Sequence, residues 1–145
     1  MWAVGFSNGG RMAYRLACDL PGVLAGFAAV EAVPAIDCAR LRPLDVEIIA
    51  QRHDRYLTIR NGLARKSMEG WVEPTVQATV RTWRRLDGCG PRPVVRHGTA
   101  TVKTWACADG TRLQYALYSG GGHRWPPDAT PLIARLFATP RLRRV

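Results

Sequence analysis

The chain has 145 residues, and 21 Lys and Arg against 11 Asp and Glu give it a formal net charge of +10. This length suits a single domain spanning residues 1–145. Hydrophobic residues make up 47% and charged residues 22%, a composition that argues against general disorder. Because no apolar run approaches the roughly 20 residues that a transmembrane helix needs, no membrane span is expected.

The positive charge comes from 19 arginines and only two lysines. A basic excess of this kind is compatible with binding to nucleic acid or another anionic polymer. The arginines are nevertheless spread from Arg11 to Arg144, and no known nucleic-acid motif or basic stripe with interleaved aromatic residues is present. We therefore favour a solvated basic surface and expect no nucleic-acid partner. A basic module that binds anionic polymers is kept as an alternative function.

The chain opens on the apolar run Trp2–Gly5, which is typical of the end of a buried strand. The small-residue turn Ser7–Gly10 follows, and then a helical pattern that stops at Pro21 and Gly22. The side of this helix expected to face the core carries Met12, Ala13, Leu16 and Ala17.

Two buried strands are predicted next, at Phe27–Val30 and Val46–Ala50, on either side of a loop from Pro34 to Pro43. The second strand opens into the polar segment of residues 51–55. A helix is then predicted from the first turn at Pro74 to Gly88. Its apolar stripe consists of Val76, Val80 and Trp83.

The last third of the chain predicts strands at Val94–Val95, at Val102–Trp105 and around the alternating Leu113, Tyr115 and Leu117. The last of these runs into the glycine-rich segment of residues 119–123. Thr130 is expected to cap the final helix and Pro131 to begin it. The residues expected to face inward from this helix are Leu132, Ile133, Leu136 and Phe137. The order strand, helix, strand, strand, helix, strand, helix indicates an α/β architecture, and its polar segments fall at strand ends, where such sheets place their chemistry.

Gly5-Phe6-Ser7-Asn8-Gly9 matches the pattern G-x-S-x-G between a predicted strand and a predicted helix. A serine hydroxyl is a weak nucleophile unless it is exposed beside a base, and a sharp strand-to-helix turn provides that exposure. Gly5 and Gly9 are expected to relieve crowding in this turn. The amide of Asn8 would contribute one donor to an oxyanion hole. A glycine-rich connecting turn without chemistry is the alternative interpretation.

Three histidines can serve as the base: His53, His97 and His123. His123 follows a strand and three glycines, so its loop can place the imidazole over Ser7, whereas His97 lies within or beside a strand. Asp54 follows the Val46–Ala50 strand and is the predicted orienting acid, which leaves the adjacent His53 as a solvated loop residue. The resulting order Ser7, Asp54, His123 is the order expected of α/β-hydrolases.

The four cysteines, Cys18, Cys38, Cys89 and Cys107, are widely spaced and lack a C-x-x-C pair, so no metal site is expected. Short loops favour the pairings Cys18–Cys38 and Cys89–Cys107, and such disulfides would place the protein in an oxidising compartment. Four buried thiols are the alternative. The first residues contain no basic region followed by a long apolar one, so no signal peptide is predicted in this chain.

The sequence resembles the polyhydroxybutyrate depolymerase-like esterases of the α/β-hydrolase fold, a family that includes feruloyl and acetylxylan esterases. Three segments carry the resemblance: Gly5–Cys18, Trp83–Cys89 and Gly120–Pro126. They look like the family's nucleophile turn with its helix, a segment ending at a disulfide cysteine, and the catalytic-histidine loop. The family's His-Gly-x-x-Asp-Pro stretch is matched only at its aspartate, by Asp54.

The resemblance covers only the C-terminal half of such an enzyme. It implies a partial α/β-hydrolase fold, with a mostly parallel sheet flanked by helices and with the first strands, the export signal and the second oxyanion donor missing. It implies further that Trp125 lies near the acyl site and that Cys89 pairs with Cys107. The full-length protein would then be extracellular or periplasmic.

We therefore predict a serine carboxylic-ester hydrolase in which Ser7, His123 and Asp54 form the triad and Asn8 helps to bind the oxyanion. No cofactor or metal is expected. Polyhydroxyalkanoate, feruloyl and acetyl esters remain as substrate classes, and the oligomeric state is left open. A catalytically inactive remnant of a hydrolase is the second alternative.

Overall fold

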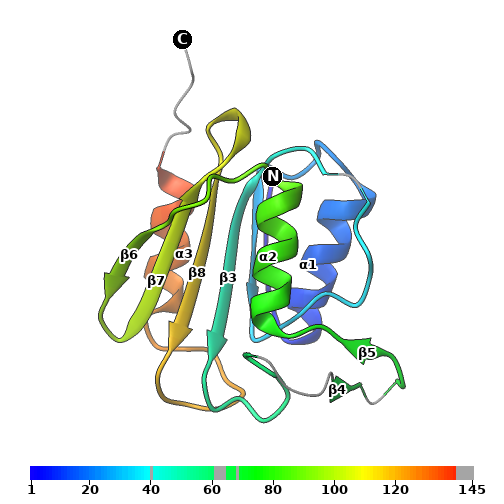
Figure 1. Ribbon diagram of the computed structural model, residues 1–145, viewed down its shortest axis with the longest axis vertical. Coiled ribbons are helices and arrows are strands. Elements are labelled where there is room, and N and C mark those ends of the chain that lie inside the picture. Colours follow the sequence, from blue (N-terminus) through cyan, green and yellow to red (C-terminus); the bar gives the residue numbers. More distant parts are fainter. Residues whose placement is uncertain (40, 61–64, 68, 140–145) are drawn as a thin grey trace.

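The computed structural model describes residues 1–39, 41–60, 65–67 and 69–139. Its centre is a six-stranded sheet in the order β1-β2-β3-β8-β7-β6 (Figure 1). The first four of these are mutually parallel: β1 (Trp2–Phe6), β2 (Gly26–Val30), β3 (Asp45–Gln51) and β8 (Arg112–Tyr118). The antiparallel β7 (Ala100–Ala106) and β6 (Val94–His97) extend the sheet on the far side of β8.

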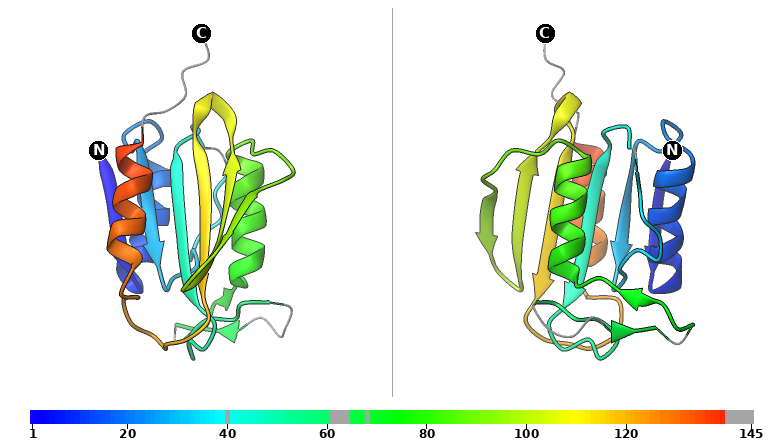
Figure 2. Two further views of the ribbon diagram at one scale, coloured as in Figure 1. Left: turned by 90° about the vertical axis from the view of Figure 1, so that its left-hand side faces the viewer. Right: turned by 45° about the vertical axis from the view of Figure 1, so that its right-hand side comes forward.

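Helices cover both faces of this sheet, so the predicted α/β class is confirmed. α1 (Asn8–Asp19) and α2 (Val76–Leu86) lie on one face and α3 (Ala129–Ala138) lies on the other (Figure 2). Because β2 and β3 are covered on both sides, every residue in them is buried. The carboxyl ends of the four parallel strands meet at one edge of the sheet, which is therefore where side chains from different strands can converge.

The larger hydrophobic core lies between the sheet and the pair α1 and α2. Three aromatic rings from three elements meet there: Tyr14, Phe27 and Trp83 have centroids 5.1 to 5.2 Å apart. A smaller core lies under α3. The stripe predicted for α2 is buried as expected, and in α3 Leu132, Ile133 and Leu136 are buried while Phe137 is partly exposed.

The strand predicted at the start of the chain is present as β1, but the expectation that it is buried is wrong. β1 pairs with β2 alone among the described residues and lies at the edge of the sheet, so Val4 is 51% exposed and Trp2 and Phe6 are also exposed. The inward side of α1 was also misplaced at one position, because Met12 is 56% exposed. Ala13 and Ala17 face the core as expected, and Tyr14, which was not predicted there, is buried beside them, since the close approach of α1 to the sheet leaves room for small side chains and one ring.

The helix starts differ slightly from the prediction. α2 is capped by Thr75, whose side chain accepts from the Ala78 N–H, so Pro74 precedes the helix. α3 begins at Ala129 with Asp128 at the capping position, two residues before the expected cap Thr130. A short antiparallel pair, β4 (Arg65–Lys66) and β5 (Val72–Glu73), and a single 3-10 turn, η1 (Ala108–Gly110), carried no clear sequence signal.

Two disulfides connect the cysteines as the short-loop pairing predicts. Cys18 at the end of α1 is bonded to Cys38 in the loop after β2, and Cys89 after α2 is bonded to Cys107 after β7. Both bridges therefore link a helix end to a neighbouring loop or strand end. Within the described ranges, no helix is long and apolar enough to cross a membrane.

Candidate active site

The turn between β1 and α1 presents Ser7 at the carboxyl end of the sheet. Ser7 has the positive φ of 53°, which is uncommon for a residue with a side chain. Its backbone is held on both sides, because its N–H donates to the Val30 carbonyl at 2.8 Å and its carbonyl accepts from Arg11 N–H at 3.1 Å. The turn thus fixes a strained serine at the N-terminus of α1, with its side chain available for contact.

Glycine is required in this turn at two positions, one of which the sequence did not indicate. A Cβ at Gly5 would lie 2.0 Å from the Gly9 carbonyl oxygen, and a Cβ at Gly10 would lie 2.6 Å from the Ala32 Cβ. Gly9, expected to relieve crowding, has open space around it. The crowded pair is therefore Gly5 and Gly10, because α1 starts directly against β1 and the segment after β2.

His123 contacts both of the side chains with which it was predicted to act. Its Nε2 lies 2.8 Å from Ser7 Oγ and its Nδ1 lies 2.7 Å from Asp54 Oδ2. These contacts join residues that are 116 and 69 positions apart in the chain. Since an ionised Asp54 can only accept, Nδ1 carries the proton and Nε2 is free to accept one from Ser7.

Asp54 is buried just beyond β3 and is held as a carboxylate. Burial alone would raise its pKa, but hydrogen bonds from Glu31, His123 and the Tyr56 N–H outweigh burial and lower the pKa of Asp54. The Tyr56 N–H donates to Oδ1 at 2.7 Å while His123 uses Oδ2. Both carboxylate oxygens are therefore occupied by donors, which favours the charged form.

The loop that carries His123 is tied to the end of β3 by a residue that the sequence did not single out. Gln51 Nε2 donates to the carbonyls of Gly122 at 2.6 Å and Arg124 at 2.7 Å, on either side of His123. Gly121, with φ of 79°, passes so close that a Cβ there would meet the Gln51 amide at 1.6 Å. Gln51 follows a run of apolar strand residues, and only its polarity at the strand end could have indicated a role.

Two aromatic rings flank the imidazole of His123. Phe6 lies 5.0 Å away between ring centroids and Tyr56 lies 4.7 Å away in an edge-on arrangement. These rings limit the rotation of the imidazole, whose side chain is 20% exposed. Tyr56 lies two residues after Asp54 and was not predicted as part of the site.

The other predicted residues divide into those near Ser7 and those away from it. Asn8 is the first residue of α1, where backbone N–H groups have no partner within the helix, and it lines the cleft beside Ser7. Trp125 is 38% exposed, donates its indole N–H to Thr130 at 3.1 Å, and is not among the described residues that line this cleft. His53 is exposed in the turn before Asp54, and His97 lies on β6 away from Ser7.

A cleft of about 430 Å³ opens beside Ser7 and His123. It is lined by Ser7, Asn8, Arg11, Glu31, Ala32, Tyr56, Leu57, Lys66, Ser67, Glu69, Glu73 and His123. Arg11 forms an ion pair with Glu73 and lies over the ring of Trp71 at 5.0 Å. The cleft is therefore lined by several charged side chains together with the serine and the histidine.

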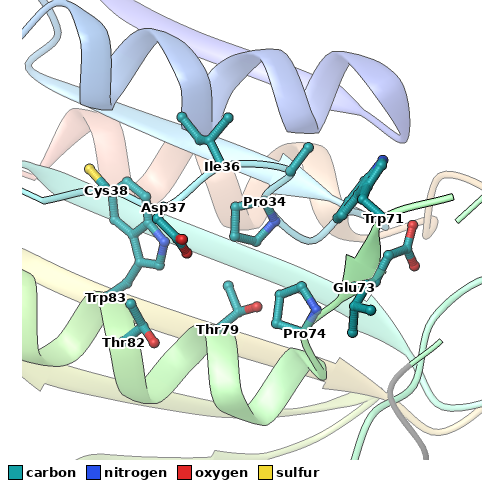
Figure 3. A pocket seen from close by; sticks show the side chains of 12 residues that line it. Pro34, Ile36, Asp37, Cys38, Trp71, Glu73, Pro74, Thr79, Thr82 and Trp83 are labelled. Atoms are coloured by element: carbon teal, nitrogen blue, oxygen red, sulfur yellow. The ribbon is translucent and has the colours of Figure 1, made fainter. Parts of the chain in front are cut away.

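A second cavity of about 420 Å³ lies between α2 and the loop after β2 (Figure 3). Trp83, Cys38 and Asp37 lie at one end of it and Trp71 and Glu73 at the other (Figure 3). Glu73 lines both cavities. Glu73, which is ion-paired with Arg11, is thus shared by this cavity and the one that contains Ser7.

Two groups of side chains in the described part of the chain have the composition of metal sites, and both are engaged otherwise. Glu31, Asp54 and His123 offer ligand atoms within 4.8 Å of one another, and these atoms are already hydrogen-bonded to each other and to Ser7. In the other group, Asp87 lies beside Cys89 and Cys107, whose sulfurs form a disulfide. The first arrangement suits proton transfer better than metal binding.

Comparison with known proteins finds similarity to a protein that is named as an esterase. The chain is 28% identical over 150 aligned residues to a protein named "Putative esterase NocK" from Nocardia uniformis subsp. tsuyamanensis. The match covers 90% of this chain and 44% of the relative, so the chain spans less than half of that protein's length. No protein-family model matches the chain. The similarity supports an esterase-like protein.

Proposed function

We propose that this chain carries the catalytic triad of a serine carboxylic-ester hydrolase, in a partial α/β-hydrolase fold. The observation that carries the proposal is the placement of the His123 imidazole between Ser7 Oγ and Asp54 Oδ2. A nucleophile, a base and an orienting acid in hydrogen-bonded sequence are the arrangement that activates a serine. The similarity to a protein named as an esterase supports the same class of reaction.

The first half of the reaction forms an acyl-enzyme. Ser7 Oγ attacks the ester carbonyl carbon while its proton passes to His123 Nε2, and Asp54 stabilises the resulting imidazolium through Nδ1–H. The tetrahedral oxyanion lies at the N-terminus of α1, where the Asn8 N–H and the helix dipole favour negative charge. The C–O bond to the alcohol then breaks, and His123 delivers the proton to the departing oxygen.

The second half releases the acid and regenerates Ser7. Water enters the cleft, gives a proton to His123 Nε2 and attacks the acyl carbonyl through the same oxyanion position. The tetrahedral intermediate collapses, and Ser7 Oγ recovers its proton from His123. Each step uses groups of the protein and water.

The proposed substrates are esters of the kinds cleaved by polyhydroxybutyrate depolymerase-like enzymes: polyhydroxyalkanoate, feruloyl and acetyl esters. The resemblance of the segments around Ser7 and His123 supports this choice, and Trp125 remains the proposed acyl-site contact. The two disulfides support an extracellular or periplasmic protein, because such bonds persist in oxidising compartments.

Hydrolysis of p-nitrophenyl acetate, methyl ferulate and a 3-hydroxybutyrate oligomer by wild type and Ser7→Ala tests both levels of the proposal. Hydrolysis that depends on Ser7 supports the esterase, and the relative kcat/KM of the three esters identifies the substrate class. Folded protein that hydrolyses none of a broad ester panel would contradict the proposal and favour an inactive hydrolase.

A further inference from the structure

Glu31 is a buried carboxyl group directly beside the proposed triad, and the mechanism above does not use it. It follows β2, is 1% exposed, and has the positive φ of 51°. Its backbone N–H donates to the Ile49 carbonyl at 2.9 Å, which fixes it at the same edge of the sheet as Ser7 and Asp54. A strained, buried acid at this edge requires a physical reason.

The side chain of Glu31 has a defined hydrogen-bonding arrangement. One oxygen, Oε2, accepts from the Gln51 N–H at 3.3 Å. The other, Oε1, is buried and receives no N–H or O–H from the described residues. A carboxyl oxygen of Glu31 also lies within 4.8 Å of a carboxyl oxygen of Asp54, and two buried carboxyl groups this close together can share a hydrogen bond only when one of them holds a proton.

The surroundings place that proton on Glu31. Burial, together with the hydrogen bond to Asp54 and the charge of Asp54, raises the pKa of Glu31 to about 9. The pKa of Asp54 is lowered instead, because its hydrogen bonds outweigh its burial. Near neutral pH the pair is therefore a neutral acid beside a carboxylate.

We propose that Glu31 is a positioning residue of the triad, which as a neutral acid donates a hydrogen bond to Asp54 and so orients the carboxylate that receives His123 Nδ1–H. This inference rests on the proposed function. With the Tyr56 N–H on Oδ1 and His123 on Oδ2, the Glu31 hydroxyl provides a third donor to the same carboxylate. Loss of the Glu31 proton would remove this donor and place a second negative charge against Asp54.

Other charged and titratable side chains face the same region. Asp54 and His123 lie beside Glu31, Tyr115 faces it from β8, and Arg11, Lys66, Glu69 and Glu73 line the shared cleft. Burial raises the pKa of Tyr115 to about 12, despite the nearby positive charges of Arg52 and Arg60. Tyr115 therefore remains neutral while Glu31 loses its proton near pH 9.

Two variants of Glu31 distinguish the effect of its hydrogen-bond donor from the effect of its ionisation. In Glu31→Gln the amide keeps an acceptor for Gln51 N–H and a donor for Asp54 but cannot ionise, whereas Glu31→Ala removes the donor. Glu47→Gln is the matched control, because Glu47 is the other buried glutamate with a raised pKa and lies in the middle of β3. Circular dichroism establishes that each variant is folded.

The first readout is the ¹³C NMR titration of the Asp54 side-chain carboxyl, which needs no activity. In wild type and Glu47→Gln we expect the Asp54 signal to shift near pH 9 as Glu31 ionises, and in Glu31→Gln this shift is lost. In Glu31→Ala the pKa of Asp54 rises. A shift near pH 9 that persists in Glu31→Gln, or an Asp54 titration that is the same in all variants, overturns the proposal even if the protein proves to be no esterase.

The second readout is ester hydrolysis as a function of pH. Glu31→Ala should lower kcat by roughly 10- to 100-fold with little change in KM, the range expected for losing a hydrogen bond to a charged group. Glu31→Gln should stay within about threefold of wild type below pH 8 and lose the wild-type decline above pH 9. Equal losses in both variants would contradict the donor role. If Glu31→Ala does not fold, the pH profile of Glu31→Gln decides alone.

Discussion

Glu47 is the buried charge whose removal should change stability most clearly. It lies in the middle of β3 and is fully buried, and neither carboxylate oxygen receives a hydrogen bond from the described residues. In the sheet it lies between Ala28 and Gln114, and the Gln114 amide donates to Thr104 instead. Ile49, two residues along on the same face, packs into the core under α3. We predict that Glu47→Leu stabilises the protein.

The magnitude follows from the cost of an unsatisfied buried group. Leaving such a group without a partner costs about 1–3 kcal/mol, so Glu47→Leu should raise the free energy of unfolding by about that amount at pH 4, where the carboxyl group is protonated in both the native and the unfolded state. At this chain length each kcal/mol corresponds to roughly 2–4 °C in Tm. Glu47→Gln, which keeps a buried polar side chain, should gain less than Glu47→Leu.

The gain should depend on pH with a definite sign. Burial raises the pKa of Glu47 well above the ordinary 4.5, so the native state keeps a proton that the unfolded chain has released. Stability from this group is therefore fully present below about pH 4.5 and falls as the pH rises toward the native pKa. The slope is about 1.4 kcal/mol per pH unit for one proton.

Urea unfolding of wild type, Glu47→Leu and Glu47→Gln at pH 4, 5.5 and 7 checks this reasoning. The advantage of Glu47→Leu over wild type should grow with pH across this series, and the difference between the two variants should stay nearly constant. A variant that is less stable than wild type at pH 7, or an advantage that does not change with pH, would refute the argument.

Three further predictions concern the site and its support. Gln51→Leu should lower kcat of ester hydrolysis about 10- to 100-fold with KM nearly unchanged, because both hydrogen bonds to the His123 loop are lost; unchanged kinetics would argue against the tether. Gly5→Ala should lower expression and Tm sharply while the matched Gly9→Ala should not, since only the first Cβ meets backbone at 2.0 Å; equal Tm values would contradict the crowding. Replacing both Cys18 and Cys38 by Ser should cost about 3 kcal/mol in urea unfolding, as expected for a loop of 20 residues; an unchanged midpoint would show that the bridge does not constrain the unfolded chain.

Much of the sheet could be predicted because its strands are short apolar runs separated by turn residues. Val46–Ala50 reads as a fully buried strand from its composition alone, and the structure extends it by one residue at each end. The G-x-S-x-G pattern, the aspartate after a strand and the histidine after three glycines each indicated a strand end. Their meeting at one edge follows from parallel topology, which is why three residues so distant in the chain could be chosen together.

The errors and omissions arise from tertiary contacts that local pattern does not contain. Val4 reads as buried because it is apolar, yet β1 lies at a sheet edge. The helical pattern does not place Tyr14 on the inward side of α1, because the burial of its ring depends on contacts with the rings of Phe27 and Trp83. Glu31 follows an apolar strand, a position where a charged residue is commonly exposed to solvent. Its proposed role depends on its proximity to Asp54, which the local sequence does not show.

The most direct test of the central claim is intact-mass detection of covalent labelling by a fluorophosphonate, followed by peptide mapping. The account predicts one adduct on folded wild-type protein, located at Ser7, and no adduct on Ser7→Ala. His123→Ala should react far more slowly, because the proton on Ser7 Oγ then has no base at 2.8 Å. An adduct at another residue, labelling that survives Ser7→Ala, or folded wild-type protein that takes no label would contradict the assignment of Ser7 as an activated nucleophile.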